Sequence, residues 1–283
     1  KNHYAEAYSD LVDRCAFSRP QWLSKISKDA LEQFTRLGFP LQQRGNESWK
    51  YTNIEPISKK DFVFSNGNLS EVPDRSGLTT DDPEQLVIVV EDGMIRKQPT
   101  VWTDSHSPCQ YISTFQDALK NPKLSLLLQQ HLTKYSQYED DAFTALNTAF
   151  IKEGILIYLP KNVTLSKPIE LRFIFSPESR NKHMQPRILI IMDSGSHATI
   201  VQKYESSTQS EYFCNTVSEV VLENDASLIV NTLQNQSISS YHINTTKVLL
   251  KKRSRLEANT TDIGGSLVRN NVRIHLLETE SSC

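Results

Sequence analysis

Residues 220–230 (VVLENDASLIV) and 248–258 (VLLKKRSRLEA) decide the fold of this chain. Each segment holds an apolar run, a short polar turn and a second apolar run. Leu228 and Leu256 take the same place in the two segments, and their residue numbers differ by 28. Ile200 precedes Leu228 by the same interval. A constant period is typical of stacked units that bury their apolar faces against their neighbours. We therefore expect these three side chains to form one interior column.

The whole region from Gly154 onward follows the same pattern of short apolar runs and polar turns, and no helical period is present in it. Turns are expected at 193–197, 223–225 and 251–254. The apolar runs are 155–159, 169–175, 188–192, 217–222, 228–233, 248–250 and 272–277. Such short strands without intervening helices favour a β-helix over a helical solenoid or a propeller. A two-sheet sandwich would give similar strands, but it would not require a fixed period.

The N-terminal part has helical periodicity instead. One predicted helix places Tyr4, Tyr8, Leu11, Val12 and Cys15 on a single face. A second helix carries Ile26, Leu31, Phe34 and Leu37 and ends at Gly38, a residue type that favours helix ends.

Further along the chain we expect helices at 119–132 and 141–152 and a strand at 86–90 followed by a turn. The acidic residues 139–141 are interpreted as a helix cap rather than as catalytic groups. The chain thus divides into a helical domain (1–62), a mixed α/β connecting region (63–153) and an incomplete β-helix core (154–283).

Composition excludes several classes of protein. The 283 residues carry a net charge of −2, which argues against non-specific nucleic-acid binding. No apolar run approaches the roughly 20 residues that cross a membrane. The four cysteines are widely dispersed and contain no C-x-x-C pair, so we expect reduced thiols in the cytoplasm. Six N-x-S/T sequons would also suit a secreted glycoprotein, but a strand-and-turn sequence rich in Asn, Ser and Thr explains them more simply.

No catalytic motif was found. The nine glycines form no phosphate-binding loop and no nucleophile elbow, so we expect no ATPase activity and no enzyme active site. The basic group Lys251, Lys252, Arg253 and Arg255 is either a solvated turn, which we favour, or a contact for a phosphate or a partner.

Cys214 and His242 are the candidate metal ligands, and their residue numbers also differ by 28. Side chains at equivalent places in successive coils would stack about 5 Å apart. A thiolate and an imidazole at that distance could share a soft metal ion. His275 lies in the same repeat region. All three residues could equally be unrelated core or surface groups, and we favour that interpretation.

Three segments carry a resemblance to a known family. They are residues 38–40 (GFP) with 47–52 (ESWKYT) and Pro56, residues 141–150 (DAFTALNTAF), and residues 264–270 (GGSLVRN). In this order they resemble the SufB/SufD family, and the chain is more similar to the D-type than to the B-type subunits. In the first segment we expect Trp49 and Tyr51 to anchor a helix and Glu47 to pair with Lys50.

The resemblance implies a right-handed parallel β-helix and a non-catalytic scaffold role in SUF iron–sulfur cluster assembly. The implied partners are a SufB-like scaffold subunit and a SufC-like ATPase of the ABC type. The cluster would be held transiently in the complex and not stably by this chain alone. Family members continue into further coils and an ATPase-docking C-terminal region, so we expect a truncated chain that forms a homodimer through 270–283. A B-type subunit and a carbohydrate-active β-helix enzyme are the alternatives.

Overall fold

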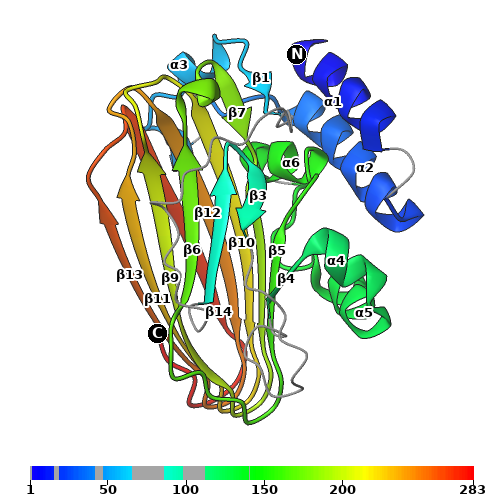
Figure 1. Cartoon of the computed structure of the whole chain (residues 1–283), viewed down its shortest axis with the longest axis vertical. Helices are drawn as coiled ribbons and strands as arrows, with labels where there is room; N and C mark the ends of the chain where they lie inside the picture. Colours follow the sequence, from blue (N-terminus) through cyan, green and yellow to red (C-terminus); the bar gives the residue numbers. More distant parts are fainter. Residues whose placement is uncertain (1, 16–18, 42–46, 66–85, 98–111, 140) are drawn as a thin grey trace.

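The computed structural model is a solenoid of two β-sheets, with helices beside one of the sheets (Figure 1). The structure describes residues 2–15, 19–41, 47–65, 86–97, 112–139 and 141–283. The first sheet contains β1 (Val63–Phe64), β4 (Ile112–Thr114), β5 (Ile155–Leu159), β7 (Lys182–Met184), β8 (Arg187–Met192), β10 (Phe213–Leu222), β12 (Tyr241–Leu250) and β14 (Leu267–Leu276). The second sheet contains β2 (Leu86–Glu91), β3 (Met94–Lys97), β6 (Ile169–Phe175), β9 (His197–Ser206), β11 (Ser227–Asn235) and β13 (Arg255–Asp262).

In the solenoid, consecutive strands along the chain alternate between the first sheet and the second sheet. The pairs β5–β6, β8–β9, β10–β11 and β12–β13 form about four coils, and β14 begins another. Successive coils pair in parallel in both sheets. The predicted fold, mainly β with helices and with a parallel β-helix after an N-terminal helical region, is confirmed.

The lower turns, which lead from the first sheet to the second, repeat one backbone conformation (Figure 1). One residue in each turn has a positive φ, and its N–H donates to a carbonyl in the turn of the next coil. These residues are Asn162 (φ 61°), Gly195 (φ 68°), Asp225 (φ 62°) and Arg253 (φ 53°). Asn, Asp and Gly tolerate this left-handed region better than other residues, whereas Arg does not favour it. The structure therefore confirms the three turns predicted from sequence, and these turns stack on one another.

The predicted column of three residues is only partly correct. Leu228 pairs with Leu256 as expected, but its partner in the preceding coil is Ala198, and Ile200 pairs with Val230. The repeat is not constant, because the strands of the second sheet and the upper connections after them both shorten. β9, β11 and β13 contain 10, 9 and 8 residues, and the connections that follow are 207–212, 236–240 and 263–266. The numbering difference between paired positions of the first sheet accordingly falls along the solenoid, from 30 to 28 to 26.

Each of these two changes, from 30 to 28 and from 28 to 26, is a change of two residues, and this preserves the inward and outward alternation of side chains. Ile200, Leu228 and Leu256 are therefore all buried in the same core between the sheets, although Ile200 lies two positions out of register. Two stacked aromatic pairs, Phe173 with Tyr204 and Phe175 with Tyr212, each with ring centroids 4.6 Å apart, continue this core upward.

The helices gather on the outer side of the first sheet (Figure 1). They are α1 (Asn2–Cys15), α2 (Gln21–Leu37), α3 (Glu55–Ser58), α4 (Phe115–Lys120), α5 (Pro122–His131) and α6 (Ala142–Ala149), with short 3₁₀ turns at Glu47–Trp49 and Pro177–Ser179. α2 ends at Gly38, whose φ of 64° and ψ of 178° suit glycine. None of the helices among the described residues is long and apolar enough to cross a membrane.

Three local predictions in this helical part need correction. The helix expected at 119–132 is two helices, because Pro122 starts a new one and Asn121 caps it in an extended conformation. On α1, Tyr4 and Leu11 are buried as predicted, but Val12 is 38 % exposed. On α2, Leu37 is 39 % exposed beside the buried Phe34. The side chain of Cys15 lies outside the described part of the chain.

The connecting region supplies strands to both sheets. The predicted strand is β2, which pairs in parallel with β6 and is followed by the turn at Asp92 and Gly93. β4 pairs antiparallel with β5. The division of the chain at residues 62 and 153 stays a prediction.

Candidate functional site

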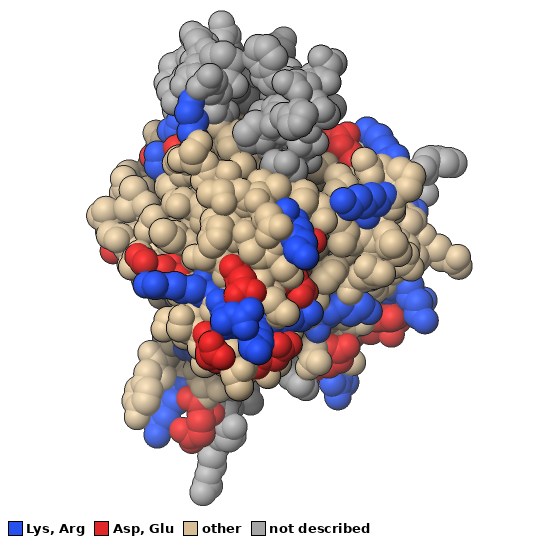
Figure 2. Space-filling model, turned by 90° about the horizontal axis from the view of Figure 1, so that it is seen from below, with Lys and Arg blue, Asp and Glu red and all other residues tan. Residues whose placement is uncertain are grey.

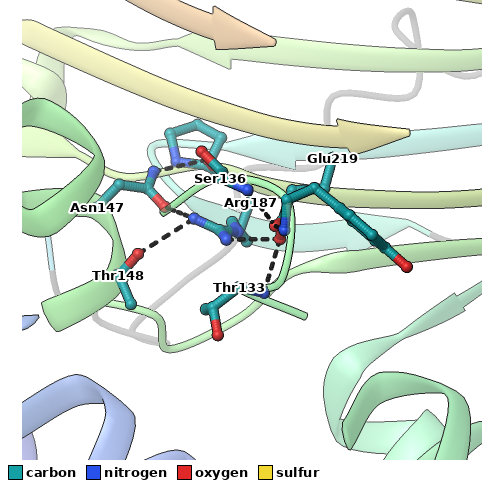
Figure 3. Close-up of polar contacts among 8 residues, drawn as sticks. Thr133, Ser136, Asn147, Thr148, Arg187 and Glu219 are labelled. Atoms are coloured by element: carbon teal, nitrogen blue, oxygen red, sulfur yellow. Dashed lines mark hydrogen bonds and ion pairs between the residues drawn. The ribbon is translucent and has the colours of Figure 1, made fainter. Parts of the chain in front are cut away.

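A buried ion pair lies between the first sheet and the helices (Figure 3). Arg187 opens β8 and Glu219 lies in the middle of β10, and the guanidinium Nη2 is 2.7 Å from the carboxylate Oε2. Both side chains are fully buried. Removing two charges from water costs several kcal/mol per ion unless other polar groups compensate.

The compensation for Glu219 comes from the backbone of the loop after α5 (Figure 3). The N–H groups of Thr133, Tyr135 and Ser136 donate to the two carboxylate oxygens at 2.9, 3.0 and 2.8 Å. Together with Arg187, four donors occupy the carboxylate. A single side chain of the solenoid therefore fixes the path of this loop across the sheet.

The compensation for Arg187 comes from α6. Its Nη1 donates to Asn147 Oδ1 at 3.2 Å and to Thr148 Oγ1 at 3.3 Å. The Asn147 amide donates in turn to the carbonyls of Pro186 and Asn215 at 2.9 and 2.8 Å. Charge-assisted hydrogen bonds of this kind are stronger than neutral ones. The segment 141–150 is thus fastened to two adjacent strands by polar contacts in a dry environment.

The segment 47–52 is held by β14 at the other end of the chain. The Arg269 guanidinium lies 3.9 Å from the centroid of the Trp49 ring and donates to Thr52 Oγ1 and the Ser48 carbonyl, each at 2.7 Å. Trp49 also packs on Phe143, with ring centroids 5.0 Å apart. The three segments that carried the family resemblance therefore meet in space.

The predicted roles in the first segment are partly correct. Trp49 is buried, and Glu47 pairs with Lys50 at 3.8 Å. Tyr51 anchors nothing in the interior, because it is 89 % exposed. It lies two residues after Trp49, just past the short 3₁₀ turn.

Cys214 and His242 are direct neighbours on β10 and β12, as their spacing predicted. Both are buried inside the solenoid, where the Cys214 thiol lies 3.6 Å from Thr216 Oγ1 and His242 Nδ1 is hydrogen-bonded to Gln236. Burial raises the pKa of the Cys214 thiol to about 12 and lowers the pKa of His242 to about 3. At neutral pH the pair is therefore a protonated thiol and a neutral imidazole.

His275 does not join this pair, because it is exposed and pairs with Leu249 farther along the sheet. Within the described residues, no group of three or more His, Cys, Asp or Glu side chains could hold a metal ion. Cys214 and His242 stay weak candidate metal ligands, and the favoured interpretation of them as unrelated groups also stays a prediction.

Two protein-family models together match almost the whole chain. Residues 1–171 match the family model of the SufBD protein N-terminal region, and residues 174–283 match the SufBD core domain of SUF system FeS cluster assembly. The chain belongs to the SufBD family. The contact of Trp49 with Arg269 thus joins the N-terminal region of a SufBD protein to its core domain.

Curated SufBD relatives are distant in sequence. The chloroplastic protein ABCI7 of Arabidopsis thaliana is 30 % identical over 90 % of this chain and 53 % of its own length. A SufBD family iron–sulfur cluster assembly protein of Synechocystis is 25 % identical over 83 % and 52 %. The iron–sulfur cluster assembly protein SufD of Bacillus subtilis is 25 % identical over 77 % and 49 %. The chain spans about half the length of these relatives.

The basic turn of this SufBD chain is paired with the acidic turn of the preceding coil. Lys251 lies 2.8 Å from Glu223, and Arg253 lies 2.6 Å from Asp225. Figure 2, which shows the molecule from below, displays basic and acidic side chains next to one another across this end. The structure agrees with a solvated turn, the interpretation that the sequence favoured.

The acidic residues before α6 also agree with the simpler interpretation. Asp141 caps the helix by accepting a hydrogen bond from the Thr144 N–H at 2.7 Å, and Asp140 lies outside the described residues. Arg187 and Glu219 were not predicted. The available signal was Glu219, the single charged residue within the mainly apolar strand segment 217–222.

Proposed function

We propose that this chain is a non-catalytic scaffold subunit of SUF iron–sulfur cluster assembly, acting with a B-type scaffold subunit and an ABC-type ATPase. The contact of the three segments 47–52, 141–150 and 264–270 carries the proposal. These contacts hold the N-terminal region and the solenoid in a fixed arrangement, which a binding surface requires. The iron–sulfur cluster is then the cargo of the complex and not a resident group of this chain.

Among the members of the complex we propose the D-type position. The SufD protein of Bacillus subtilis, among the matching relatives, supports it, as does the LNTAF-type segment at 146–150. A B-type subunit is the alternative within the same machinery.

The outer face of the second sheet argues against a carbohydrate-active enzyme. Such an enzyme needs carboxylates that act on substrate as acid, base or nucleophile. On this face Glu170 pairs with Arg172 and Lys203 at 3.4 and 3.1 Å, and Glu205 pairs with Arg172 at 3.1 Å. These carboxylates of successive coils are neutralised by cations, which favours a structural role for them.

For location we propose the cytoplasm, because the sequence suits reduced thiols. A plastid is the alternative, since the relative ABCI7 is chloroplastic. The proposed contact with the B-type subunit involves β14 and the residues after it, and the ATPase contact involves a region beyond the described solenoid.

The test combines the purified chain with a B-type subunit and measures the mass of the eluting species by light scattering. We expect a one-to-one complex that Val272→Glu disrupts and Val63→Glu does not. Both valines are similarly exposed, at 52 % on β14 and 55 % on β1. Equal behaviour of the two variants, or a homodimer in place of the complex, would contradict the proposed partner surface.

The non-catalytic part of the proposal has its own measurement. After anaerobic reconstitution, iron analysis should find no stoichiometric cluster on the chain alone, and the chain should not hydrolyse ATP. A stable cluster bound to this chain would show that it is more than a scaffold.

A further inference from the structure

A cavity of about 330 Å³ opens on the outer face of the first sheet, beside the buried ion pair. β12, β14 and the residues between α5 and α6 line it. Its charged side chains are three cations, Lys134, Lys247 and Arg273, and one carboxylate, Asp141. The chain as a whole has a net charge of −2, so this excess of positive charge is local.

Lys247 is the decisive residue, because it is only 7 % exposed. Within the described residues its ammonium group has no hydrogen bond or ion pair. Burial and the nearby Arg273 guanidinium lower the pKa of Lys247, while Asp141 acts in the opposite direction. The stem of Lys247 is thus buried, whereas its ammonium nitrogen is not among the fully buried side-chain atoms that lack a partner. The ammonium group therefore keeps contact with the solvent of the cavity, where an anion can reach it.

The sheet register explains why Lys247 lacks a partner. Its neighbour on β10 is Glu219, and its neighbour on β14 is Arg273. Glu219 is already occupied by Arg187 and by the backbone N–H groups of the loop at 133–136. One carboxylate oxygen of Asp141 accepts the hydrogen bond that caps α6. Glu219 is therefore not available to the cavity, and Asp141 alone cannot balance its three cations.

We propose that this cavity binds a small polyvalent oxyanion of the phosphate class. Lysine ammonium groups attract such an anion as point charges, and the Arg273 guanidinium can donate two parallel hydrogen bonds to it. The wall that carries Lys134 is held in place by Glu219, so the site exists before the anion arrives. Tyr135, Leu249 and Leu277 leave room and an apolar surface for an organic part attached to the phosphate. This binding goes beyond the scaffold role and does not depend on it.

The experiment is calorimetric titration of the full chain with inorganic pyrophosphate at physiological salt. We expect saturable one-to-one binding that Lys247→Met weakens at least tenfold. The matched control is Lys28→Met, which removes the same charge from an exposed position on α2 and should leave affinity unchanged. Because the Lys247 ammonium group keeps solvent contact and Met has a similar apolar stem, Lys247→Met should leave the unfolding temperature close to that of the parent.

Two results would overturn the proposal. One is either an equal loss of pyrophosphate affinity in both variants or no saturable binding. Either outcome would mean that only the overall electrostatic field of the protein acts on the anion. The other is tighter binding of citrate than of pyrophosphate, which would assign the cavity to carboxylates.

Discussion

Two pairs of arginine with an acidic residue form in this protein under opposite conditions. Arg187 and Glu219 are fully buried under the helices, whereas Arg253 and Asp225 at the lower turns are 44 % and 50 % exposed. Their distances are almost the same, 2.7 and 2.6 Å. The difference is that water screens the exposed pair and not the buried one. Burial and the surrounding hydrogen bonds, more than the distance, therefore decide how much each pair matters.

The largest expected effect comes from placing a charge where no partner exists. Leu228→Asp puts a carboxylate into the core between the sheets, next to Leu256 and Ala198. We expect a loss of about 5 kcal/mol or more, and hence unfolding of the solenoid. Urea denaturation followed by circular dichroism measures it.

The control for this variant is Ile229→Asp, one residue along β11 on the opposite, half-buried side. It should cost much less. If Leu228→Asp were as stable as Ile229→Asp, the assignment of the interior face would be wrong.

The buried ion pair should give the next largest effects, and they should be unequal. Replacing either partner leaves an uncompensated buried charge, which costs about 3–5 kcal/mol. After Arg187→Met, Glu219 keeps three backbone donors. After Glu219→Leu, those three N–H groups lose their acceptor, and Arg187 keeps only the neutral acceptors Asn147 and Thr148. Glu219→Leu should therefore destabilise more in urea unfolding. The opposite order would mean that the loop at 133–136 does not depend on Glu219.

A structural feature could be predicted from the sequence where its signal lies in residues close together along the chain. The turns and the buried faces were predictable, because alternation of apolar residues survives in each coil. The register was predictable between Leu228 and Leu256 but not for Ile200, since shortening a coil by two residues leaves the alternation unchanged. Cys214 and His242 were paired correctly because their coil keeps the repeat length that the sequence indicated.

Polar contacts between distant parts of the chain left no local pattern. Glu219 binds N–H groups that lie 83 to 86 residues earlier, and Arg269 binds Thr52 across 217 residues. Tyr51 was misplaced because residue type does not tell whether a side chain just after a short 3₁₀ turn faces the core or the solvent.

A third prediction concerns acid. His183 is fully buried among Tyr4, Phe64 and Phe150, and burial lowers its pKa to about 3. An unfolded histidine has a pKa near 6.5, so between these values the unfolded chain binds a proton that the folded chain refuses. The contribution to stability is complete above pH 6.5 and decreases by about 1.4 kcal/mol per pH unit as the pH falls.

Unfolding free energies measured from pH 7 to pH 4 test this prediction, with His183→Gln as the comparison. The variant should lose stability less steeply than the parent as the pH falls. Equal slopes would mean that the imidazole of His183 is accessible to protons in the folded chain.

The smallest effect is expected at the exposed pair. Asp225 accepts two hydrogen bonds from Arg253, at 2.6 and 2.8 Å, and these lower the pKa of its carboxyl group. Any stabilisation from this charge is complete above the ordinary aspartate pKa and is lost as the pH falls through the lower folded value. Asp225→Asn removes the charge but keeps a residue type that tolerates the φ of 62°, so its urea midpoint at pH 7 should match the parent. Asp225→Ala, which tolerates that φ poorly, should be less stable than Asp225→Asn. A large loss in Asp225→Asn would show that charge, and not backbone conformation, holds the stacked turns together, and the contrast with Arg187 and Glu219 would disappear.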